Sequence, residues 1–92
     1  MPVPATPDRD VLLGAAYSAE RDWARAIQYL QAALDEGRAT PDVLNGLGWA
    51  ELQAGHRDRA VALFERSLAA RRDQPEIKKL VDELRVARQG SQ

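Results

Sequence analysis

The chain has 92 residues, of which 45% are hydrophobic and only 5% aromatic, with a formal net charge of -1 and no cysteine. This length predicts one domain with one modest core, and the absence of cysteine excludes disulfides, thiolate metal sites and a cysteine nucleophile. The near-neutral charge gives no electrostatic reason to expect nucleic acid or an anionic membrane as the main partner.

No stretch predicts secretion or membrane insertion. The start, MPVPATP, lacks the basic and apolar regions of a signal peptide, and no apolar run approaches the roughly 20 residues of a membrane span. We expect a cytoplasmic location by default, which would not hold for a piece of a larger exported protein. Residues 1–6 alternate proline with small residues and are expected to form an extended leader.

Two helices are predicted in the first 40 residues. Thr6, Pro7 and Asp8 are the residue types that cap a helix, begin it without losing a hydrogen bond and face the positive end of its dipole. Apolar residues then recur at helical spacing in two runs, which the polar residues 20–22 separate. Gly37 is expected to end the second helix.

The same pattern occurs a second time. Residues 41–74 repeat residues 7–40 at an offset of 34, without a gap. The matched residues are Pro7, Asp8, Leu13, Gly14, Ala16, Arg25, Ala26, Leu34 and Arg38 in the first copy and Pro41, Asp42, Leu47, Gly48, Ala50, Arg59, Ala60, Leu68 and Arg72 in the second. Two helix hairpins in an all-α fold are therefore predicted.

Glycines at the same point of both copies predict a close approach of the two helices in each hairpin. Gly14 and Gly48 lie mid-helix, where glycine costs about 0.5–1 kcal/mol relative to alanine. We expect this cost to be offset by close packing against the small residues Ala26 and Ala60 of the second helices.

The Leu-Gly pair, the small alanine that begins the second half of each copy and the Ala-Leu or Ser-Leu near its end resemble the tetratricopeptide repeat (TPR) family over residues 7–74. The resemblance implies an α-solenoid of two TPR-like repeats, 7–40 and 41–74. It also implies that an amphipathic segment at 75–89, with Asp82 where the repeats have glycine, is a capping helix, the fifth helix in total. Residues 90–92 are expected to be a disordered tail.

The first helix is expected to close the other end of the array. Arg9 and Glu20 stand where the second copy has Val43 and Ala54, so an upstream repeat would have nothing apolar to bury there. Two repeats are few for a solenoid, and marginal stability or a dimer that lengthens the stack is the expected consequence.

The chain offers few groups for catalysis. His56 is the sole histidine, in a predicted turn, and we interpret it as a solvated turn residue rather than a ligand or a base. No phosphate loop, serine elbow or paired-histidine spacing is present. We therefore predict a protein that is not an enzyme, with no cofactor and no metal site. Basic residues from Arg57 to Lys79 are interleaved with acids, which argues against nucleic-acid binding.

By resemblance, the first helix of each hairpin lines a concave groove that holds a peptide or a partner's helix. The groove residues so implied are Asp8, Val11, Ala15, Ser18 and Ala19, then Asp42, Asn45, Trp49, Leu52 and Gln53, then Glu76 and Lys79. We predict the partner contacts at Val11, Ala15, Asn45, Trp49, Leu52, Gln53 and Lys79.

Trp49 is the most informative of these residues, because its counterpart in the first copy is Ala15 and the fold alone does not demand a large ring there. Two interpretations stay open, namely a ligand-binding residue and a side chain that folds down onto Leu52 or Asn45 as partial core. Trp23 begins a second helix, where the family commonly has a packed aromatic residue, and is interpreted as structural.

The partner's chemistry is partly constrained by the resemblance. One subclass of the family grips a C-terminal carboxylate with Lys, Asn and Arg, and this chain has other residues at those positions, namely Val11, Ala15, Gly46, Glu76 and Leu80. Asp8, Asp42 and Glu76 would form an acidic row that favours a neutral or basic segment, although the helix dipole alone also favours acids there.

Three hypotheses follow from the sequence. The main one is a protein-interaction scaffold that binds a peptide or a partner helix near Trp49 and Asn45. The rival is a self-association module, a homodimer. The third and least supported is an enzymatic role. As a further alternative, the chain fits a fragment of a larger multi-repeat or enzyme-linked protein.

Overall fold

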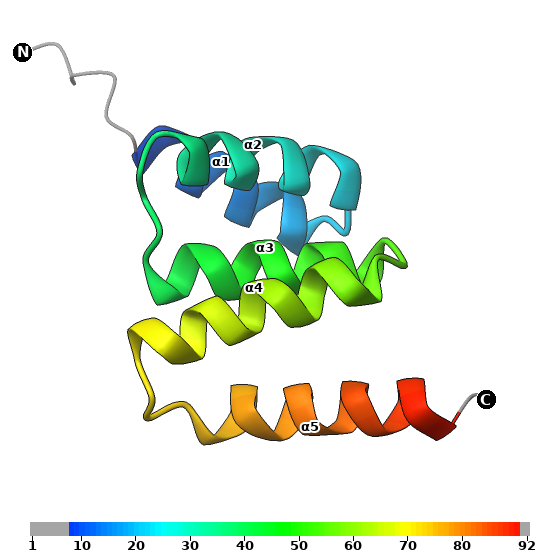
Figure 1. The fold of residues 1–92 in the computed structure, drawn as a ribbon. Coiled ribbons are helices and arrows are strands. Elements are labelled where there is room, and N and C mark those ends of the chain that lie inside the picture. The colour runs from blue at the N-terminus through cyan, green and yellow to red at the C-terminus, as the bar shows by residue number, and fades with distance from the viewer. Residues whose placement is uncertain (1–7, 91–92) are drawn as a thin grey trace, which may run out of the picture.

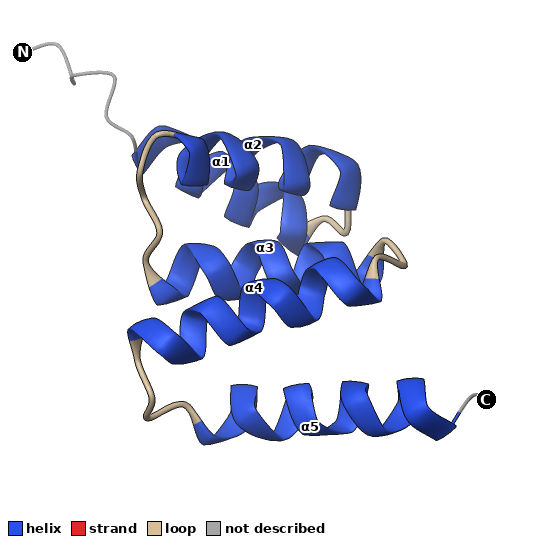
Figure 2. Cartoon of the chain, in the orientation of Figure 1, coloured by secondary structure: helices blue, strands red, loops and turns tan. Residues whose placement is uncertain are grey.

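The protein is described by a computed structural model, in which residues 8–90 form five α-helices joined by short loops (Figure 2). The helices are α1 (Asp8–Ala19), α2 (Trp23–Asp35), α3 (Pro41–Gln53), α4 (Arg57–Ala70) and α5 (Pro75–Gly90). The predicted all-α fold is confirmed. Helix α5 includes Gly90, which the sequence placed in the tail. The predicted leader at 1–6, the cap Thr6 and the tail residues 91 and 92 lie outside the described residues.

The helices are arranged as two stacked antiparallel hairpins with a single helix after them (Figure 1). Helices α1 and α2 form the first hairpin, α3 and α4 form the second, and the hairpins meet through α2 and α3. Helix α5 lies along α4, over fewer contacts than the helices of one hairpin make with each other. This is the stacking expected of a helical solenoid. Among residues 8–90, no helix is long and apolar enough to cross a membrane.

The hydrophobic core lies between the three middle helices. The buried hydrophobic side chains there are Ala26, Leu30 and Ala33 of α2, Val43, Leu44, Leu47 and Ala50 of α3, and Ala60 and Phe64 of α4. Among the described residues, α1 buries only Gly14, and α5 buries only Val81. The end helices therefore cover the core with one face each, and the other faces of α1 and α5 are left to solvent or to partners.

The two mid-helix glycines make room for large side chains. A Cβ atom at Gly14 would lie 2.5 Å from Leu30 Cγ, and one at Gly48 would lie 2.8 Å from Phe64 Cε1. Real Cβ atoms essentially never approach a neighbour so closely. Both positions therefore require glycine for as long as the opposite side chain keeps its place.

The predicted helix pairs are right, but the side chains nearest to the glycines are not the predicted alanines. Ala26 and Ala60 are fully buried, yet they lie one turn before the side chains that contact the glycines, Leu30 and Phe64. The glycine on one helix leaves space for the large side chain on the other, which fills the gap between the two helices. Close packing needs complementary volumes rather than small residues on both helices.

Three helix ends share one backbone motif, a left-handed residue that reverses the chain. Gly37 and Gly55 have φ values of 94° and 90°, and Arg21 has a φ of 60°. In each case the next N–H donates to the carbonyl five residues earlier, from Asp22 to Tyr17 at 2.9 Å, Arg38 to Ala33 at 3.1 Å and His56 to Glu51 at 2.8 Å. The expected helix end at Gly37 is confirmed. Arg21 takes the position of Gly55 in the repeat, with a side chain that this conformation disfavours.

The helix starts differ in their caps. Thr40 Oγ1 accepts a hydrogen bond from the N–H of Val43 at 3.3 Å, as its residue type predicts. Asp22 Oδ1 accepts from the N–H of Arg25 at 3.3 Å and so caps α2. His56, at the repeat position of Asp22, makes no side-chain cap for α4. Its imidazole is used elsewhere, as described below.

The outer face of α1 is less polar than the sequence comparison predicts. Arg9 and Glu20 are exposed, as expected for charged residues at that end. Leu12, however, is 69% exposed on the same helix. Its counterpart in the second copy is Gly46, so the comparison of Arg9 and Glu20 with their counterparts did not reveal this apolar side chain.

Candidate functional site

The predicted groove residues come from three helices. Val11 and Ala15 lie on α1, Asn45, Trp49, Leu52 and Gln53 lie on α3, and Lys79 lies on α5. Helices α1 and α3 contact each other directly. Ala15, Trp49, Gln53 and Lys79 are exposed, whereas Val11, Asn45 and Leu52 are half-buried. The predicted contacts on α1 and α3 thus lie on neighbouring helices, and Lys79 lies apart from them on α5.

Trp49 has a large apolar surface outside the core. Trp49 is 46% exposed, whereas Leu44, Leu47 and Ala50 on the same helix are buried. Part of Trp49 is therefore covered by the fold, and the remaining surface is available to another molecule. Trp23, in contrast, is half-buried at the start of α2, in keeping with a structural role.

Asn45 lies one turn before Trp49 and connects α3 to the loop that leads into α5. Its Nδ2 donates to Gln74 Oε1 at 2.8 Å. The Gln74 amide nitrogen in turn reaches back to α4, where it is within 3.0 Å of Ser67 O and Oγ and 2.8 Å of Arg71 O. Gln74 thereby satisfies carbonyl groups at the end of α4 instead of capping α5, a role that the sequence did not predict.

One acceptor in this network has no partner. Asn45 Oδ1 is buried and makes no hydrogen bond. An open hollow of about 290 Å³ is lined by Asn45, Gln74, Pro75, Glu76 and Ile77, but the oxygen itself is covered by the fold. A buried amide oxygen without a donor costs about 1–3 kcal/mol, so this acceptor lowers the stability of the fold.

The predicted acidic row is described in part. Asp42 and Glu76 are exposed in the first turns of α3 and α5. The side chain of Asp8, the third member of the row, lies outside the described residues. Lys79, the basic residue among the predicted contacts, is exposed on α5.

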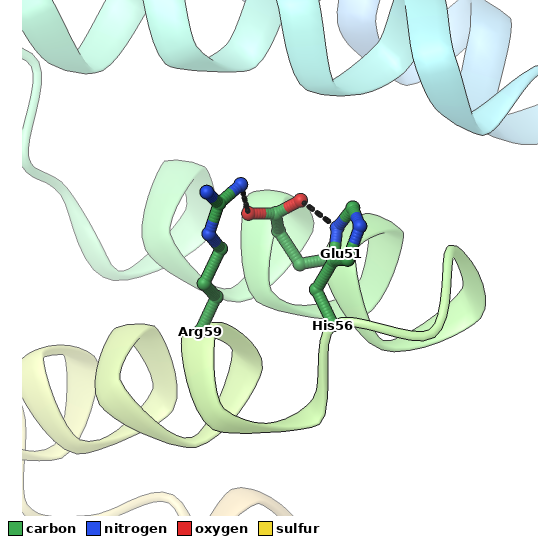
Figure 3. Close-up of polar contacts among 3 residues, drawn as sticks. All are labelled: Glu51, His56 and Arg59. Atoms are coloured by element: carbon green, nitrogen blue, oxygen red, sulfur yellow. Dashed lines mark hydrogen bonds and ion pairs between the residues drawn. The ribbon is translucent and has the colours of Figure 1, made fainter.

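A buried carboxylate lies at the opposite end of α3 (Figure 3). Glu51 is 4% exposed, its Oε1 is 2.9 Å from His56 Nδ1, and its Oε2 is 3.6 Å from Arg59 NH1. The two basic groups come from the start of α4 and lie on either side of the carboxylate. A carboxylate this buried requires such partners, because an unpaired charge in a core is strongly destabilising.

The first hairpin has different residues at two of the same three positions and an arginine at the third. Tyr17, Asp22 and Arg25 are the counterparts of Glu51, His56 and Arg59. Arg25 lies over the Tyr17 ring at 5.5 Å from its centroid and pairs with Asp22 at 3.4 Å, while the Tyr29 ring stacks on Tyr17 at 5.5 Å. The arginine is kept, and the acid has moved from the turn to the helix.

This cluster changes the interpretation of His56. Its side chain is 48% exposed, so it borders solvent as predicted, but it also holds the buried Glu51. Among the described residues, no group of three or more His, Cys, Asp and Glu side chains could hold a metal ion. The sequence analysis passed over Glu51. The match of Arg25 to Arg59 was the available signal that this position matters.

Two acidic side chains, Asp10 of α1 and Glu36 at the end of α2, lie close together in the first hairpin. The pKa of the Glu36 carboxyl is raised, first by partial loss of hydration and then by the nearby Asp10 carboxylate, with which it also hydrogen-bonds; Arg38 acts in the opposite direction. Glu36 is exposed at the end of α2. The pair is a local repulsion on the surface, between the start of α1 and the end of α2.

A family model described as Tetratricopeptide repeat matches residues 17–84, which include α2, α3 and α4 completely and most of α5. No curated protein matches the chain in a sequence comparison. The match covers more than half of the chain and agrees with the paired hairpins, the 34-residue offset and the glycine positions described above. The chain belongs to the tetratricopeptide repeat family.

Proposed function

We propose that this protein is an interaction module that binds a peptide or a partner's helix across α1 and α3, with Trp49 as the main contact. TPR domains generally mediate protein–protein interactions, and the proposal adds the place and the residues. The observation that carries it is the 46% exposure of Trp49 on a helix whose other large apolar side chains are covered.

Trp49 has the properties of an interface hot spot. A tryptophan ring offers a large apolar area at low entropic cost, and such residues dominate the energy of many interfaces. Its counterpart Ala15 on the adjacent α1 is small and exposed, so α1 places no second large ring at the equivalent position.

The charges favour a neutral or basic segment over an acidic one. Asp42 and Glu76 lie in the first turns of α3 and α5, and Glu76 also lines the hollow beside Asn45. A lysine or arginine that reached this hollow would face the Glu76 carboxylate. We therefore propose a ligand with an apolar residue for Trp49 and a basic residue near it.

A binding role is better supported than a catalytic one. The sole histidine has its Nδ1 against the buried Glu51, so that nitrogen is committed to the fold. Of the exposed predicted contacts, Trp49, Gln53 and Ala15 carry no nucleophile and no general base, and Lys79 lies apart from them on α5.

The test is a selection from a random peptide display library, followed by calorimetric titration of the enriched peptides. The enriched sequences are expected to combine an apolar with a basic residue, and Trp49→Ala is expected to weaken their binding at least about 30-fold, from the roughly 2 kcal/mol of a hot-spot residue. Leu12→Ala is the matched control, since Leu12 is also an exposed large apolar residue but lies on the outer face of α1.

Two results would contradict the proposal. One is that Trp49→Ala binds the enriched peptides as tightly as the wild type. The other is that Leu12→Ala loses binding equally, which would move the site to the outer face of α1. Thermal melting by circular dichroism shows whether each variant keeps its fold.

A further inference from the structure

Helix α5 has one face on α4 and a second, charged face that none of the described residues covers. Its packed face consists of Ile77, Leu80, Val81 and Leu84, which join the cluster around Ala60 and Phe64. On the opposite side of the helix, the residues from 75 to 86 are all exposed, and Val86 is 67% exposed. These outer residues are Pro75, Lys78, Lys79, Asp82, Glu83 and Val86, and they line one continuous open depression.

The charges on the outer face of α5 occur in an ordered pattern. Lys78 and Lys79 lie one turn before Asp82 and Glu83. Lys78 and Asp82 share one flank of the face, and Lys79 and Glu83 share the other, because residues four apart lie above one another on a helix. Among the described residues, none of the four has an ion-pair partner within the chain. The fold itself therefore leaves this pattern unused.

We propose that the outer face of α5 binds the same face of a second copy of the chain, with the two helices antiparallel. A two-fold axis at the level between Leu80 and Val81 brings like flanks together. Lys78 then lies opposite Asp82 of the second copy, and Lys79 lies opposite Glu83 of the second copy. Symmetry repeats both contacts, so four ion pairs form at one interface.

The same register also matches the apolar residues. Val86 of one copy lies opposite Pro75 of the other. Symmetry gives this contact at both ends of the helix pair, so the exposed Val86 side chain of each copy is covered. A parallel pairing would do the reverse, because it would bring lysine to lysine and acid to acid, which is repulsive. The sequence of α5 thus favours one orientation and one register.

The dimer is expected to be weak and sensitive to salt. A single pair of helices buries an area at the low end of specific interfaces, and each exposed ion pair contributes little. We expect a dissociation constant on the order of 100 µM. Lys79 would lie in the dimer interface, whereas Trp49 on α3 would remain exposed for peptide binding. The inference therefore does not depend on the proposed peptide site.

Charge reversal provides the test, by sedimentation velocity of the full chain at protein concentrations from 10 µM to about 1 mM. Lys78→Glu with Lys79→Glu, and separately Asp82→Lys with Glu83→Lys, should each lose self-association at least tenfold. An equal mixture of the two variants should form a heterodimer. The chain with all four reversals should dimerise like the wild type, because every opposed pair is again of opposite sign.

Arg57→Glu with Arg66→Glu is the control of equal charge change, since both residues are exposed on α4. It should keep the wild-type association. A wild type that is monomeric throughout the concentration range would overturn the inference and leave the α5 face for another protein. Double reversals that associate as well as the wild type would also overturn it, since the dimer would then use another surface.

Discussion

Arg59 lies one repeat after Arg25, and the two arginines hold different partners at the same place in their hairpins. Arg25 covers the ring of Tyr17, whereas Arg59 pairs with the buried carboxylate of Glu51. The turn residue before each arginine has changed in step, from Asp22 to His56. Each hairpin therefore carries one acid beside its arginine, in the turn in the first copy and in the helix in the second.

This exchange predicts strong coupling between Glu51 and His56. His56→Asp alone would place a second carboxylate beside a buried one and should lower the free energy of unfolding by about 1–2 kcal/mol. Glu51→Tyr alone would remove the acceptor of Arg59. The double change recreates the first hairpin's pair and should recover at least about 1 kcal/mol relative to the sum of the single changes. Urea unfolding measures all three, and additive effects would contradict the coupling.

Arg21 predicts a stabilising substitution. It has a positive φ of 60° at the position where the second hairpin has Gly55. Arg21→Gly removes the strain of a side chain in the left-handed conformation and should raise the unfolding free energy by about 1 kcal/mol, less the entropy of the added glycine. The reverse change, Gly55→Arg, should destabilise by a similar amount. Opposite shifts in melting temperature are expected, and two shifts of the same sign would show that φ is not the cause.

Gly46 and Gly48 provide a matched pair on one helix. A Cβ at Gly48 would meet Phe64 at 2.8 Å, whereas one at Gly46 would lie 3.5 Å from Leu30, which is ordinary contact. Gly48→Ala should cost about 1–3 kcal/mol through overpacking. Gly46→Ala should be neutral or stabilise by up to about 1 kcal/mol, since alanine suits a helix better. If both variants unfold at the same urea concentration, the Phe64 contact does not govern the site.

Gln74 should matter more for stability than Asn45. The Gln74 amide serves four groups on two helices, while Asn45 makes one hydrogen bond and carries an unpaired oxygen. Gln74→Ala leaves the carbonyl of Arg71 without this donor and should lower the unfolding free energy by about 1–3 kcal/mol. Asn45→Val, which copies Val11, should cost less than about 1 kcal/mol because it also removes the unpaired oxygen. The reverse ranking in chemical denaturation would show that Asn45 holds the loop.

The sequence alone predicted what depends on local chemistry and periodicity. Thr40, Gly37 and the apolar stripes determine helix starts, ends and faces, and they act within a few residues of themselves. The repeat comparison also located Gly14 and Gly48. It could not identify Leu30 and Phe64 as their neighbours, because that choice depends on how the two helices are rotated against each other. Gln74 shows the same limit, since its residue type indicates a poor cap, whereas its partners Arg71, Ser67 and Asn45 lie 3, 7 and 29 residues earlier in the chain.

For the candidate site, the comparison of the two copies identified one important residue and missed another. It singled out Trp49 through its difference from Ala15, and the ring is indeed partly exposed. Glu51 escaped notice because a glutamate in a helix is ordinarily solvated, and only the tertiary contacts with His56 and Arg59 make its burial tolerable. The role of Asn45 within a hydrogen-bond network likewise required the position of the α4–α5 loop.

The uneven core has a consequence for how the molecule opens. Helices α2, α3 and α4 supply nearly all the buried side chains, and α5 contributes Val81 from its described residues. Amide hydrogens of α5 should therefore exchange with solvent through local opening at a lower free energy than those of the middle helices. Each such opening would uncover Ala60 and Phe64. The contacts that hold α5 on α4 therefore also protect the chain from aggregation, because they keep these apolar side chains covered.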